Sequence, residues 1–125
     1  MKNKKIVVIG LLLLSLLLVA CGATKEANFP TGKFLKSGTV NHGLVFNEDG
    51  TFSVFDGNIT IVNGTYSVDG DTYTDESNNQ SCPPMSFKYT FDGTNLTFNY
   101  VGNPADDPCD GRRADFNDVT YIISK

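Results

Sequence analysis

The sequence predicts an all-β domain, a small antiparallel up-and-down barrel of about eight short strands, with a two-sheet sandwich as the alternative. Short runs rich in aromatic and β-branched residues are separated by Asp-Gly and Asn-Gly turn signals at intervals of about 8 to 14 residues. Within the runs, apolar and polar residues alternate, so each strand has one apolar face. Successive hairpins favour the barrel, because each strand then pairs with the next one in the chain.

Turn signals divide the domain into its strands, because Asp-Gly and Asn-Gly supply positive φ angles at little cost. The signals are Asp49-Gly50, Asp56-Gly57, Asn63-Gly64, Asp69-Gly70 and Asp92-Gly93. We expect strands at 45–46, 51–55, 59–62, 65–68, 72–74, 86–91, 96–100 and 119–123. After residue 21 no segment has a helical period with caps, and one turn of helix fits best at 110–116.

The first 20 residues have the composition of an export signal. Three lysines within residues 2–5 precede an uninterrupted non-ionic run at 6–20. A retained membrane anchor is the alternative, but the run is shorter than the roughly 20 residues that span a bilayer. It ends in Leu-Val-Ala-Cys-Gly at 18–22, which resembles the lipobox of bacterial lipoprotein signal peptides.

That resemblance implies cleavage before Cys21 and acylation of this cysteine, which would anchor the chain in a lipid bilayer. The expected organisation is a signal peptide at 1–20, a lipidated tether at 21–28 and the β domain at 29–125. The expected location is the bacterial cell envelope, on the outer side of the cytoplasmic membrane or in the outer membrane. Residues 21–125 carry seven basic and fourteen acidic side chains, a formal net charge of −7, which argues against a nucleic-acid partner.

Two cysteines remain once Cys21 is assigned to lipid. Cys82 and Cys109 would lie in a compartment where disulfides persist, and we expect them to be bonded to each other. The alternative is a thiolate metal site, but two distant cysteines and one histidine form no recognisable ligand spacing. We therefore predict no metal and no cofactor.

The start of the domain carries a second resemblance. Gly32-Lys33-Phe34 is similar to the Gly-x-Trp signature that opens the first strand of lipocalins and related calycins, with Phe34 where those families have Trp. In those families an arginine near the last strand packs over the Trp and closes the barrel end. The resemblance implies a small lipocalin-like barrel in which Gly32, Phe34 and one of Arg112 and Arg113 close that end.

Other residues with chemical potential have simpler structural explanations. His42 could serve as a general base, but no nucleophile signature accompanies it, and a solvated loop position is the simpler interpretation. The acidic loop 103–111 could offer oxygen ligands to Ca²⁺, although its aspartates are expected to satisfy turns in solvent. Arg112 and Arg113 could bind an anion instead of closing the barrel.

The resulting hypothesis is a non-catalytic envelope lipoprotein whose barrel binds a small apolar or amphipathic ligand. The strand-borne aromatic side chains expected to line the site are Phe52, Tyr66, Phe87, Tyr89, Phe91 and Phe98. The alternative is a filled domain whose outer surface and loops bind an envelope protein or a glycan. A hydrolase would require a cleft that holds His42 and a paired carboxylate.

Overall fold

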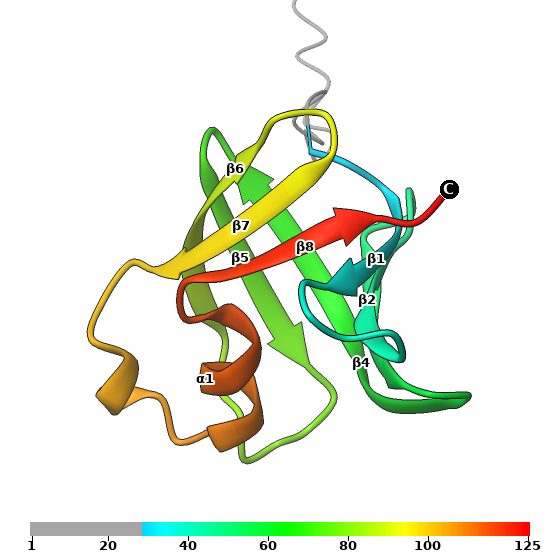
Figure 1. Ribbon diagram of the computed structural model, residues 1–125. Coiled ribbons are helices and arrows are strands. Elements are labelled where there is room, and N and C mark those ends of the chain that lie inside the picture. The colour runs from blue at the N-terminus through cyan, green and yellow to red at the C-terminus, as the bar shows by residue number, and fades with distance from the viewer. Residues whose placement is uncertain (1–28) are drawn as a thin grey trace, which may run out of the picture.

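The computed structural model describes residues 29–125, which form eight strands, a short 3₁₀ helix and one α-helix (Figure 1). The predictions for the signal segment, Cys21 and the tether lie outside the described residues. In chain order the elements are β1 (Gly32–Lys36), β2 (His42–Phe46), β3 (Thr51–Asp56), β4 (Ile59–Asp69), β5 (Thr72–Ser77), β6 (Met85–Phe91), β7 (Asn95–Tyr100), η1 (Pro104–Asp106), α1 (Asp110–Phe116) and β8 (Val119–Ile123). The helix occupies the segment where one was predicted. No helix of this part of the chain is long and apolar enough to cross a membrane.

The eight strands form one closed barrel. Each strand pairs antiparallel with the next, and β8 also pairs antiparallel with β1. Phe34 on β1 lies opposite Leu44 on β2 and opposite Ile123 on β8. Because every strand is paired on both sides, the barrel has no open sheet edge. The structure confirms the predicted up-and-down barrel and excludes the two-sheet sandwich.

Strand β4 runs through a position where the sequence predicted a turn. Asn63 and Gly64 lie inside this single strand of 11 residues, and Gly64 pairs with Phe52 on one side and Ser77 on the other. A Cβ at Gly64 would lie 2.1 Å from the carbonyl oxygen of Glu76 and 2.9 Å from the Phe52 ring. Gly64 therefore permits close packing in the barrel wall instead of a turn, and the turn prediction was wrong.

Aromatic side chains occupy the middle of the barrel. Tyr73 lies among them, with its ring centroid 5.2 Å from Phe98, 5.7 Å from Phe46 and 6.0 Å from Phe116 of α1. All four side chains are buried. The interior at this level is therefore filled by side chains, as expected for a barrel of only eight strands.

The six aromatic side chains predicted to line a ligand site belong to this packed core. Phe52, Phe87 and Phe98 are buried. Tyr66, Tyr89 and Phe91 are partly buried and pack against the same cluster.

The two ends of the barrel differ in their connections. The upper end in Figure 1 holds the β2–β3, β4–β5 and β6–β7 turns and both ends of the described chain. The lower end holds the β1–β2, β3–β4 and β5–β6 connections and the long β7–β8 connection, which carries α1.

Phe29 closes the upper end. Its ring centroid lies 5.0 Å from Tyr89, 5.1 Å from Phe46, 5.3 Å from Tyr66 and 5.5 Å from Tyr73. Contacts of this kind, edge-on and stacked, are favourable arrangements for aromatic rings. The first described residue therefore packs against two of the aromatic side chains that were predicted to line a ligand site, Tyr66 and Tyr89.

Candidate functional site

A disulfide fixes α1 at the lower end. Cys82 in the β5–β6 connection is bonded to Cys109, which precedes the first residue of α1, with 5.6 Å between the two Cα atoms. The structure thus contains the predicted disulfide. It links two segments that are separated by 27 positions in the sequence, and it holds the start of the helix against the neighbouring loop.

Next to the disulfide lies a buried cluster of charges centred on Arg112. Its Nε and Nη2 donate to the two carboxylate oxygens of Asp107 at 2.7 and 2.8 Å, and its Nη1 donates to Asp75 Oδ1 at 3.0 Å. Tyr100 Oη donates to Asp107 Oδ2 at 2.7 Å. The backbone N–H of Cys109 donates to Asp107 Oδ1 at 2.9 Å. This network connects β5, β7 and α1 across the lower end.

The two carboxylates of the cluster have opposite pKa shifts. Burial raises the pKa of Asp75 to about 6, against the attraction of Arg112. Burial also acts to raise the pKa of Asp107, but hydrogen bonds from Arg112 and Tyr100 outweigh it and bring the pKa down to about 2. Asp107 is thus the main partner of the guanidinium, and Asp75 is the carboxylate that takes up a proton first.

His42 takes part in a second polar cluster, centred on Asp115. His42 is the first residue of β2, and its Nε2 lies 2.8 Å from Asp115 Oδ1. Lys36 Nζ donates to the same oxygen at 3.2 Å and to the carbonyl of Ala114 at 2.8 Å. His42 is half-buried, so the prediction of a solvated loop position was wrong. The cluster joins α1 to β1 and β2.

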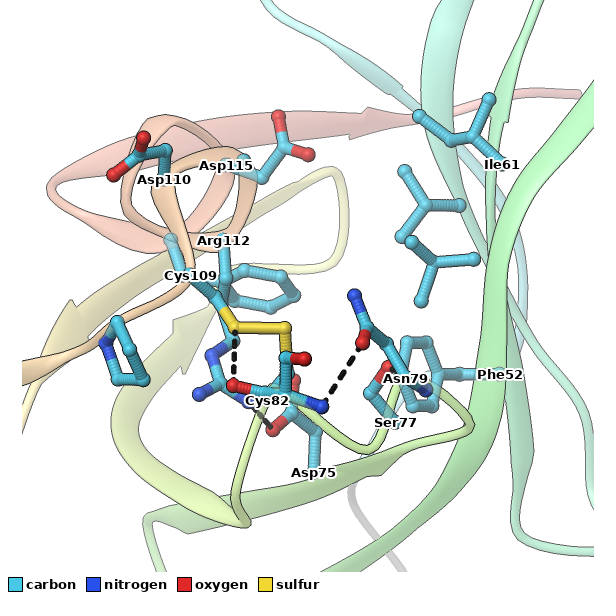
Figure 2. A pocket seen from close by; sticks show the side chains of 16 residues that line it. Phe52, Ile61, Asp75, Ser77, Asn79, Cys82, Cys109, Asp110, Arg112 and Asp115 are labelled. Atoms are coloured by element: carbon cyan, nitrogen blue, oxygen red, sulfur yellow. Dashed lines mark hydrogen bonds and ion pairs between the residues drawn. A yellow bond between two sulfur atoms is a disulfide. The ribbon is translucent and has the colours of Figure 1, made fainter.

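A cleft of about 310 Å³ opens between α1 and the lower half of the β3–β4 hairpin (Figure 2). Its apolar wall consists of Phe52, Val54, Ile61, Val62 and Phe116. Its polar and sulfur-bearing wall includes Asp75, Ser77, Asn79, Cys82, Cys109, Asp110, Arg112 and Asp115. Figure 2 shows Asp110, Arg112 and Asp115 of α1 on one side and Phe52 and Ile61 on the other, with Ser77 and Asn79 drawn beside Phe52.

Few of the residues that were predicted from the sequence to bind a ligand line this cleft. Of the six predicted lining residues only Phe52 lines it. Asp115 also lines it, whereas its partner His42 does not. The hydrolase hypothesis needed both groups in one cleft, and the structure provides only their pairing.

The residues expected to close the barrel lie in different places. Gly32 has a φ angle of 116°, which glycine adopts most readily, where the chain enters β1. Phe34 is buried, 6.0 Å from the Phe46 ring and 6.2 Å from the Phe91 ring. Arg112 lies at the lower end, where it is paired with Asp75 and Asp107.

Arg113 lies beside Arg112 but outside the buried cluster. Its guanidinium donates to the backbone carbonyl of Asp107 and to the carboxylate of Asp110, which is exposed. Both arginines are therefore engaged by acceptors of the protein itself. An anionic ligand would have to compete with these contacts.

The acidic loop has a different role from the one expected. Asp107 is buried in the Arg112 network instead of being solvated, while Asn103 caps η1 by accepting a hydrogen bond from the N–H of Ala105. Over residues 29–125 no group of three or more histidine, cysteine, aspartate or glutamate side chains is arranged to hold a metal ion.

The sequence analysis missed Asp75, and it placed Asp107 in a solvated acidic loop. The predicted strand ended at Thr74. If it had been extended, strand alternation would have placed Asp75 on the inner face, because Asp75 lies two positions after Tyr73. A buried carboxylate requires a partner for its charge, and in the structure Arg112 is that partner. No pattern in the sequence indicated that Asp107, within the acidic loop 103–111, is buried. The chain matches no protein-family model, no curated protein and no solved structure.

Proposed function

We propose that this protein is a membrane-anchored lipoprotein of the bacterial cell envelope, and that its lipocalin-like barrel binds a small apolar or amphipathic ligand in the cleft of the lower end. The observation that carries the proposal is the cleft itself. Its volume of about 310 Å³ lies at the lower limit of the range typical of small-molecule sites. An apolar wall faced by a few polar groups is also the usual composition of such sites.

The cleft has rigid boundaries, which favours binding. The disulfide fixes one end of α1, and the Arg112 network ties the helix to Asp75 on β5. At the other end of the helix, the carbonyl of Asp115 accepts a hydrogen bond from the buried Tyr121 hydroxyl at 2.9 Å. A preformed site loses less conformational entropy when a ligand binds.

The position of the cleft suits a tethered protein. The described chain begins at Phe29 in the upper end, and the cleft lies at the lower end. With Cys21 acylated, the tether at 21–28 would attach the upper end to the membrane. The cleft would then open away from the bilayer, toward a solute of the envelope.

The test is native mass spectrometry of the mature protein purified from the membranes of its own host, compared with the denatured mass. We expect an adduct that is lost on denaturation. The variant Ile61→Trp places a large ring at the rim of the cleft and should remove the adduct. The matched control is Ile59→Trp, because Ile59 is exposed on the same strand but does not line the cleft. A bare native mass for the unmodified protein would contradict the proposal.

A second candidate function, binding of an envelope protein, is favoured by apolar side chains exposed at the lower end. Val40 in the β1–β2 connection is 82% exposed, and Ile59 and Ile61 on β4 are 68% and 53% exposed. Exposed apolar groups near one another are typical of interaction surfaces. The double variant Val40→Ser, Ile59→Ser tests this function: it should abolish crosslinking to a partner and leave a cleft-bound adduct unchanged.

A further inference from the structure

The charges that line the cleft are unevenly distributed. Three carboxylates, those of Asp75, Asp110 and Asp115, line it together with one guanidinium, that of Arg112. Three of the nitrogen atoms of Arg112 already donate to Asp75 and Asp107. An anion that entered the cleft would therefore meet a cation whose charge is already offset by two carboxylates.

Counting the partners of these groups leaves an excess of negative charge. Asp110 is paired with Arg113, and Asp115 with Lys36. Arg112 alone faces both Asp75 and Asp107. These four carboxylates and three cations, counted without His42, carry one more negative than positive charge. The rest of the domain has the same sign, since residues 21–125 carry a net charge of −7, and such a field attracts cations.

The apolar part of the lining determines what the rest of the ligand must be. Phe52, Val54 and Val62 of β3 and β4 and Phe116 of α1 offer only hydrocarbon surface. A bare inorganic cation would leave this wall in contact with water. A molecule with an apolar body and one positively charged group matches both walls, since a protonated amine donates charge-assisted hydrogen bonds to carboxylates.

We infer that the cleft selects a small amphipathic cation, an apolar body that carries a protonated amine; this inference rests on the proposed function. The amine lies toward the carboxylate of Asp115, and the apolar body lies against the side chains of β3 and β4. Asp115 is largely buried, so a cation that reaches it is shielded from competing salt.

The experiment compares three probes that share one apolar body: 2-naphthylmethylamine, 2-naphthylmethanol and 2-naphthylacetate. Their binding to the mature lipidated protein is measured by calorimetry in nanodiscs of zwitterionic lipid, with the heat from empty nanodiscs subtracted. We expect the amine to bind at least about tenfold more tightly than the carboxylate, with the alcohol between them. In Asp115→Asn the affinity for the amine should fall about threefold to tenfold, while the affinity for the alcohol stays unchanged.

Two further variants keep the result interpretable. Asp71→Asn removes one carboxylate from the exposed β4–β5 turn at the upper end and should leave all three affinities unchanged. Asp115→Glu keeps the charge and should retain the preference for the amine. Equal affinities for the three probes would overturn the inference but leave the ligand cleft in place. Failure of all three probes to bind would overturn both the inference and the proposed function.

Discussion

The two ends of the barrel are closed by different kinds of interaction. At the upper end, tight turns meet around the ring of Phe29, which contacts four other aromatic rings. At the lower end, a disulfide, a buried guanidinium and two buried carboxylates hold a helix beside an open cleft. Apolar packing can close the end of a barrel, but it cannot easily hold a cleft open. An open site in so small a domain is therefore held by directional and covalent constraints.

The largest effect is expected from the guanidinium of the lower end. Arg112→Met would leave Asp75 and Asp107 buried without a cation and should lower the free energy of unfolding by about 3 to 5 kcal/mol. Urea denaturation at neutral pH measures this loss. Arg113→Met on the same helix is the control, since Arg113 is only half-buried and pairs with an exposed carboxylate. Equal losses in the two variants would show that the lower end does not depend on the buried cluster.

The disulfide should contribute almost as much. Replacing both cysteines, Cys82→Ala with Cys109→Ala, opens a loop of about 28 residues, for which chain entropy gives about 3 to 4 kcal/mol. Thermal melting under oxidising conditions, with and without a reductant, measures the loss. The reductant should lower the melting temperature of the unmodified protein and leave that of the double variant unchanged. If the double variant and the unmodified protein have the same melting temperature, the disulfide does not stabilise the domain.

The third effect makes the lower end sensitive to pH. The folded state holds the Asp75 proton more tightly than the unfolded chain, because the pKa of Asp75 rises from 3.8 to about 6 on folding. The resulting stability is fully present below about pH 4 and is lost as the pH rises through 6. Over this window the unmodified protein should lose about 2 to 3 kcal/mol more than Asp75→Asn. Parallel stability curves from pH 4 to pH 7.5 would contradict the shift.

A smaller loss is expected at the upper end. Phe29→Ala removes a ring that is only partly buried, so the cost should be about 1 to 2 kcal/mol, below that of a fully buried phenylalanine. Urea denaturation measures the change. Probe binding in the cleft should be unaffected, because the substitution lies at the opposite end of the barrel. A loss of binding would mean that the two ends are coupled.

The smallest effect is expected from the ion pair of the upper end. Lys88 Nζ lies 2.6 Å from Asp71 Oδ1, but both side chains are exposed. Lys88→Ala should leave the midpoint of urea denaturation within experimental error, because exposed ion pairs contribute little. A clear shift would show that charge pairs stabilise both ends, and not the lower end alone.

Most of the barrel could be predicted from the sequence, but little of the cleft could. Alternation along the strands and the Asp-Gly turns are local signals, and they predicted the fold class and the segment of α1. The same local logic failed at Gly64, because its small size is required by Glu76 and Phe52, which are distant in the sequence. The cleft depends on where α1 lies relative to Val62 and Ile61, a relation that no local pattern encodes. Phe52, Cys82, Cys109 and Arg112 were singled out from the sequence and do line the cleft, and Asp75 had a usable signal in its position in strand alternation.

The pairing of β1 with β8 also determines when this barrel can finish folding. These strands are the first and last elements of the described chain, so their contact closes the longest loop and has the largest entropic cost. Until β8 has been synthesised, the preceding strands can form hairpins, but the sheet retains two unpaired edges. Such edges can pair with other chains. Closure is therefore expected to limit the folding rate, and a chain interrupted before Val119 is the form most prone to aggregation.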